Sequence, residues 1–177
     1  MDLEKRTMAL YTAFVSQHAA HPELQKFWLT MARHEAGHFG ALALVESMIE
    51  NDPNLEIGRK IWFDEVTVVR LRSLLTAYLR EAQQPVTIER GLEMAIDLES
   101  SELEDVVVDL MQVVKDSVWR EQAMQFLIHD LGDLSYMVEK FTRDPKLLRR
   151  ADELLDRRVK AVRTRKARRR DAVETTR

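Results

Sequence analysis

The 177-residue chain repeats one pattern of metal-binding residue types at an interval of 95 positions. The pattern is an acidic residue, a second acidic residue 31 positions later, and a histidine or third acid three positions after that. The first copy consists of Glu4, Glu35 and His38, and the second copy consists of Glu99, Asp130 and Asp133. The repeat spans residues 1–50 and 96–145 and predicts two related helical hairpins, each with acids on both helices.

Apolar residues recur every three to four positions along most of the chain, which is typical of amphipathic helices. The predicted helices cover residues 2–20, 22–50, 57–82, 86–115 and 118–141, and another helical leucine pattern begins at Lys146. Only 5 Gly and 4 Pro interrupt these segments, too few for the turns of a many-stranded β fold. The sequence therefore predicts an all-α bundle in which residues 51–85 form a long helical crossover.

Charge divides the chain into an acidic body and a basic tail. Residues 1–142 carry 13 Lys+Arg and 24 Asp+Glu, whereas residues 143–177 carry 14 Lys+Arg and 6 Asp+Glu. We therefore expect a helical domain over 1–142 and a basic helical extension over 143–177. The stretch 160–170 has 7 basic residues in 11 and no aromatic residue, which argues against sequence-specific nucleic-acid recognition but leaves a polyanionic partner open.

The chain has no cysteine, which excludes disulfides, thiolate metal sites and a built-in rubredoxin-type iron centre. No apolar run approaches the ~20 residues of a membrane span, and the first residues include no apolar signal segment. From these features we expect a cytoplasmic protein without a membrane partner.

The spacing within each copy of the repeat has a chemical rationale. Residues three apart share a helix face, so Glu35 and His38 can converge on one ion. A four-helix core with one Glu from each of two helices and a Glu-x-x-His pair from each of the others forms a carboxylate-bridged di-iron or di-manganese site. Buried acids are costly unless a metal neutralises them or their pKa values rise. The repeated acids and His38 are therefore candidate metal ligands.

Further residues around the repeat resemble one known family. Glu4, Tyr11, Trp28, Ala32, Glu35 and His38 resemble the first half of a rubrerythrin-type ferritin-like domain. The stretch 95–99, followed by Glu102, resembles the third helix of that family, and the resemblance covers about residues 1–141. The second half departs from the family pattern, because Asp130 and Asp133 stand where Glu and His are expected and Val106 matches Tyr11. This departure leaves an asymmetric, a mononuclear and a vacant site open as alternatives.

The resemblance implies a ferritin-like four-helix bundle with a centre of two iron ions, or of manganese or zinc. It implies one ion at Glu4, Glu35 and His38 and another at Glu99, Asp130 and either Asp133 or Glu102. Tyr11 is then the candidate catalytic residue, placed to hydrogen-bond near the ions. The implied activity is that of a non-haem oxidoreductase of peroxidase or ferroxidase type, acting on peroxide, dioxygen or ferrous iron. A homodimer is expected. A separate electron-donor protein is expected if the chain is redox-active, because it lacks the rubredoxin domain that rubrerythrins usually carry.

Two other functions compete with this interpretation. A metal-free helical protein could act through association or through its basic tail. Alternatively, His34-Glu35-Ala36-Gly37-His38 matches the H-E-x-x-H motif of zinc peptidases, in which both histidines bind zinc and the glutamate acts as a base. Away from these motifs, His18 and His21 are expected in a solvated turn, and Trp28, Trp62 and Trp119 are expected in the core or in an interface.

Overall fold

The computed structural model describes the backbone of residues 2–51, 65–101 and 117–174, and most of their side chains up to residue 160. All regular elements in these ranges are α-helices, which confirms the predicted all-α class. The helices are α1 (Asp2–Gln17), α2 (Pro22–Asn51), α3 (Glu65–Glu81), α4 (Ile88–Glu99), α6 (Ser117–Phe141) and α7 (Pro145–Glu174). Several predictions lie outside the described part of the chain: those for residues 57–64 including Trp62, for Glu102, for Val106 and for the side chain of Trp119.

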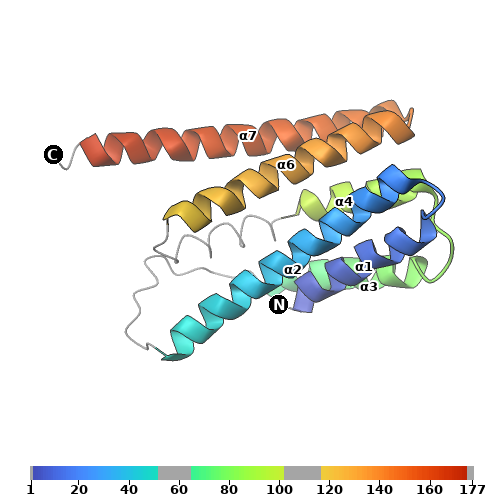
Figure 1. The fold of residues 1–177 in the computed structure, drawn as a ribbon, viewed down its shortest axis with the longest axis horizontal. Coiled ribbons are helices and arrows are strands. Elements are labelled where there is room, and N and C mark those ends of the chain that lie inside the picture. Colours follow the sequence, from blue (N-terminus) through green and yellow to red (C-terminus); the bar gives the residue numbers. More distant parts are fainter. Residues whose placement is uncertain (1, 52–64, 102–116, 175–177) are drawn as a thin grey trace.

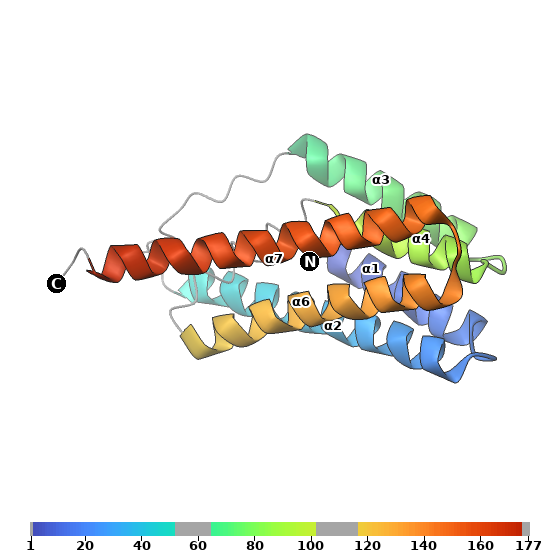
Figure 2. The same ribbon diagram turned by 90° about the horizontal axis from the view of Figure 1, so that it is seen from above.

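The helices pack around one hydrophobic core. Helix α1 packs along α2 and α6 packs along α7, while α4 contacts both α6 and α7 (Figure 1). The α1–α2 pair meets the group formed by α4, α6 and α7 where α2 contacts α6 (Figure 2). Helix α3 contacts α1. These contacts place α1, α2, α4 and α6 around the same interior. None of the helices in the described ranges is both long and apolar enough to cross a membrane.

Large apolar side chains join α1 to α2. Leu10 and Phe14 lie one turn apart on α1, and Leu24 and Trp28 lie one turn apart on α2; all four are fully buried. The ring centroids of Phe14 and Trp28 are 4.9 Å apart, within the usual range of packed aromatic pairs. Pro22 begins α2, a position where its missing N–H costs nothing. The core position predicted for Trp28 is confirmed.

His18 is buried, so the prediction of a solvated turn is wrong for this residue. Its Nδ1 accepts a hydrogen bond of 2.9 Å from the Trp28 indole, and its Nε2 therefore donates to the Val86 carbonyl at 3.1 Å. Burial lowers the pKa of His18, so the neutral ring is favoured. His21 is exposed as expected.

Helix α4 ends at Glu99, inside the segment 86–115 that was predicted as one helix. Residues 102–115 of that prediction lie outside the described part of the chain. The Ser100 hydroxyl donates to the Asp97 carbonyl at 3.1 Å, and the Ser101 N–H bonds to the Leu98 carbonyl in a tighter turn. Serine side chains compete for backbone groups in this way and weaken a helix interior. The apolar periodicity did not reveal this break.

The 95-residue repeat holds for the second helix of each hairpin. Helix α6 begins at Ser117, 95 positions after Pro22 begins α2. The first helices do not correspond as expected, since Glu4 lies near the start of α1 whereas Glu99 is the last residue of α4.

The segment predicted as a basic extension contributes to the core through the first half of α7. Leu147, Ala151 and Leu154 lie on one face of this helix and are buried. On the same helix, Arg150 pairs with Asp97 of α4. The basic stretch 160–170 continues α7 as helical backbone, and α7 ends beyond the other helices in both views (Figures 1 and 2).

A pair of glycine substitutions tests the packing around His18. A Cβ at Gly91 would lie 3.3 Å from His18 Cε1 and 3.4 Å from Trp28 Cζ2, and hydrogen bonds fix both rings. Gly91→Ala should therefore lower the free energy of unfolding by about 1 kcal/mol. Gly40→Ala, in α2 with no atom within 4 Å of the added Cβ, should raise it by ~0.5–1 kcal/mol because alanine favours the helix. Chemical denaturation of both variants measures these changes. An equal rise in the free energy of unfolding in both variants would contradict the packing described around Gly91.

Candidate metal centre

Four acidic side chains lie in the interior of the bundle, one from each of four helices. Glu4 of α1 is 0% exposed, Glu35 of α2 is 3%, Glu99 of α4 is 4% and Asp130 of α6 is 4%. These are the four acids that the repeat predicts at its matched positions. Ionised carboxylates are rarely buried without partners or a cation, so this interior requires compensating groups.

Glu4, Glu35 and His38 converge on one point. Each offers one ligand atom, and these three atoms all lie within 4.8 Å of one another. Glu35 and His38 are one helical turn apart on α2, with His38 Nδ1 3.7 Å from Glu35 Oε2. Glu4 reaches the same point because α1 packs along α2. Two carboxylates and an imidazole form a donor set that suits iron or manganese.

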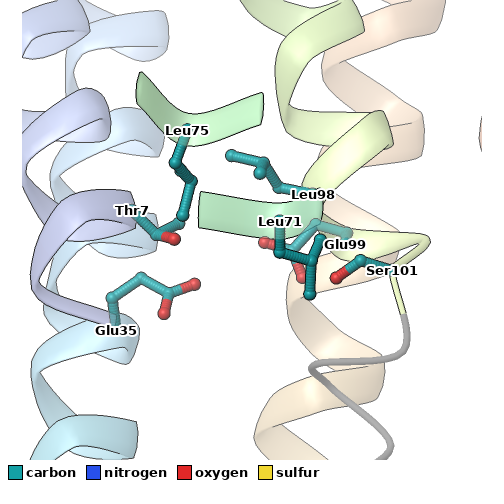
Figure 3. Close-up of a pocket in the computed structure, with 7 residues that line it drawn as sticks. All are labelled: Thr7, Glu35, Leu71, Leu75, Leu98, Glu99 and Ser101. Atoms are coloured by element: carbon teal, nitrogen blue, oxygen red, sulfur yellow. The ribbon is translucent and has the colours of Figure 1, made fainter. Parts of the chain in front are cut away.

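A small cavity separates Glu35 from Glu99. Both residues line it together with Thr7, and Figure 3 shows Glu35 and Glu99 entering from opposite sides. Leu71 and Leu75 of α3 line the same cavity with apolar side chains. Its free volume is about 10 Å³, close to that needed for one water molecule.

Tyr11 bonds to an acid of the second copy of the repeat. Its hydroxyl donates to Glu99 Oε1 at 2.8 Å, and both side chains are buried. The sequence placed Tyr11 near Glu4, on the same face of the first helix. The structure connects it to Glu99, where it fixes the orientation of that carboxylate.

Asp130 forms a close pair with His34 rather than joining the three-residue cluster. His34 Nδ1 lies 2.6 Å from Asp130 Oδ1. Burial raises the pKa of Asp130, and the hydrogen bond to His34 opposes part of this effect.

The structure does not bring Asp133 to the buried acids. Its side chain is 44% exposed, and Asp133 Oδ2 lies 3.4 Å from His129 Nδ1 at the surface of α6. Glu102, the other residue suggested for the second ion, lies outside the described residues.

The two histidines of the H-E-x-x-H segment have different acidic neighbours. In that motif both histidines bind the metal while the glutamate stays free to act as a base. Here Glu35 converges with His38, whereas His34 pairs with Asp130.

Arg158 is a buried residue of this region that the sequence analysis missed. Its side chain is buried, and Nη2 lies 3.4 Å from the carbonyl oxygens of both Glu99 and Ser101. A cation at the C-terminal end of α4 interacts favourably with the helix dipole, and it also offsets nearby negative charge. The sequence did contain a signal for the burial of Arg158, because this residue continues the apolar i, i+3/i+4 series of Leu147, Ala151 and Leu154.

Comparisons with family models, with curated proteins and with solved structures find no match to this chain.

The raised pKa of Asp130 predicts a pH-dependent effect of neutralising it. Below its unfolded pKa of 3.8, Asp130 is protonated in both states; as pH rises through the higher folded pKa, the folded protein loses stability. Asp130→Asn keeps an acceptor for His34 but has no charge. In metal-free buffer it should raise the free energy of unfolding at pH 7, with the gain shrinking toward pH 4.

Denaturant titrations at several pH values measure this gain. Asp133→Asn, the same change at an exposed carboxylate, is the control and should have little effect. A loss of stability in Asp130→Asn at pH 7 would show that the buried charge is favourable as it stands.

Proposed function

We propose that this chain is a ferritin-like protein of rubrerythrin type that binds iron or manganese through buried carboxylates and His38. Its proposed chemistry is redox conversion of peroxide, dioxygen or ferrous iron. The observation that carries the proposal is the convergence of Glu4, Glu35 and His38 within 4.8 Å in the interior. Two carboxylates and an imidazole are donors that a divalent cation can bind together.

The residues present fit a metal ion in donor type and in burial. Glu4, Glu35 and His38 would hold it, and Glu99 faces the adjoining cavity of about 10 Å³. A bound iron or manganese ion would supply the capacity to exchange electrons with oxygen species.

The surrounding residues have supporting roles in this proposal. Tyr11 orients Glu99 through its 2.8 Å hydrogen bond. Leu71 and Leu75 limit the access of water from the side of α3. Reductant would come from a separate donor protein, because the cysteine-free chain cannot build a rubredoxin centre, and a homodimer remains part of the proposal.

A metal-stabilisation experiment tests the proposed site. Metal that binds only the folded state stabilises it by ~2.7 kcal/mol at 100 times its Kd. Addition of Mn²⁺ to the metal-free protein should therefore increase the free energy of unfolding by about that amount. Glu35→Gln should abolish the increase, whereas Glu46→Gln, the same change at an exposed site on α2, should preserve it.

Three outcomes would contradict the proposal. The first is no stabilisation by Mn²⁺ or Fe²⁺, as the metal-free alternative predicts. The second is selective binding of zinc that His34→Ala abolishes and Glu35→Gln retains, as the peptidase alternative predicts. The third concerns redox chemistry: Fe²⁺ bound to the protein should be oxidised by peroxide or dioxygen faster than Fe²⁺ in buffer, and equal rates would exclude that activity.

A further inference from the structure

We infer that the centre holds one divalent metal ion, bound by Glu4, Glu35 and His38. The family resemblance implies two ions instead. This inference rests on the proposed function and concerns how the second copy of the repeat is used. In this inference neither Asp130 nor Asp133 is a ligand, and Glu99 lies across a small cavity from Glu35.

The contact between His34 and Asp130 takes Asp130 out of the ligand set. Asp130 is the residue that would bridge two ions, as the counterpart of Glu35. Its Oδ1 lies 2.6 Å from His34 Nδ1, so the two side chains are in close polar contact. A metal ion at Asp130 Oδ1 would have to displace the His34 ring from this contact.

Side-chain length favours the same conclusion. The carboxylate of aspartate ends one methylene closer to its backbone than that of glutamate, so Asp130 reaches less far from α6 than Glu35 reaches from α2. His34 lies one position before Glu35 on the facing helix and meets this shorter side chain. The pair thereby joins α2 to α6 at the level of the centre.

Asp133 does not replace the missing ligand. It is the counterpart of His38, but its side chain is 44% exposed and faces His129. The side chain of His38, by contrast, is only 14% exposed and lies in the convergent group. The i, i+3 pair of the second copy is therefore divided between the interior and the surface.

Glu99 is the one described acid of the second copy that faces the cavity shared with Glu35. Tyr11 holds one of its oxygens from α1, and Arg158 lies at its backbone carbonyl. Two ions of a shared site lie about 3.5–4 Å apart, and the described residues bring together only one group of three donors. Glu99 therefore has its own partners and faces Glu35 across the cavity without being part of the three-residue cluster.

Metal stoichiometry of the 177-residue chain tests the inference. The metal-free protein is titrated with Mn²⁺, and free Mn²⁺ is measured by electron paramagnetic resonance. We expect about one tightly bound Mn²⁺ per chain, with the spectrum of an isolated ion. Asp130→Asn should change the affinity by less than ~3-fold, while Glu35→Gln should lower it by at least ~10-fold, at the lower end of the losses found near metal sites. Asp133→Asn is the matched control and should behave as the unmodified chain does.

The possible failures are distinguishable. Two Mn²⁺ per chain with a spin-coupled spectrum, or a loss of ~10-fold or more in affinity with Asp130→Asn, would overturn the single-ion inference and leave the proposed function standing. No binding of Mn²⁺ or Fe²⁺ by the unmodified chain would overturn both. Circular dichroism of each variant checks folding, and the stoichiometry of the unmodified chain decides the question even if a variant does not fold.

Discussion

The burial of four carboxylates in one small core governs the organisation of this protein. Glu4, Glu35, Glu99 and Asp130 come from four helices, and each is at least 96% buried. In a low-dielectric interior their ionised forms are costly unless donors or cations face them. The chain supplies several such groups: Tyr11 for Glu99, His34 for Asp130, and a histidine among the three donors that converge. The packing of the helices brings these groups together.

Helices outside the two hairpins also shape this interior. Leu71 and Leu75 bring α3 against the cavity, so the crossover encloses the acids on one side. Helix α7 adds Arg158 at the end of α4, next to the backbone of Glu99. The first half of α7 is therefore integrated with the core, although the sequence marks this region mainly by its charge. Its contacts with α4 stabilise the helix end that carries one of the acids.

Much of this arrangement could be predicted from the sequence, for physical reasons. The 3.6-residue periodicity of apolar side chains reveals helices, and the 95-residue repeat selects Glu4, Glu35, Glu99 and Asp130 as buried acids. The partners of those acids could not be predicted, because they depend on how the helices face one another. Spacing alone cannot distinguish Asp130 pointing inward from Asp133 pointing outward, nor show that His34 bonds across to α6. The break after Glu99 depends on serine hydroxyls, which apolar periodicity does not detect.

Anomalous diffraction from crystals of the protein soaked in Mn²⁺ tests the central claim most directly. The account predicts an anomalous peak within coordination distance of Glu4, Glu35 and His38, on the side of the cavity that Glu99 faces. A peak bound jointly by His34 and His38, or no peak in the interior at saturating Mn²⁺, would contradict it.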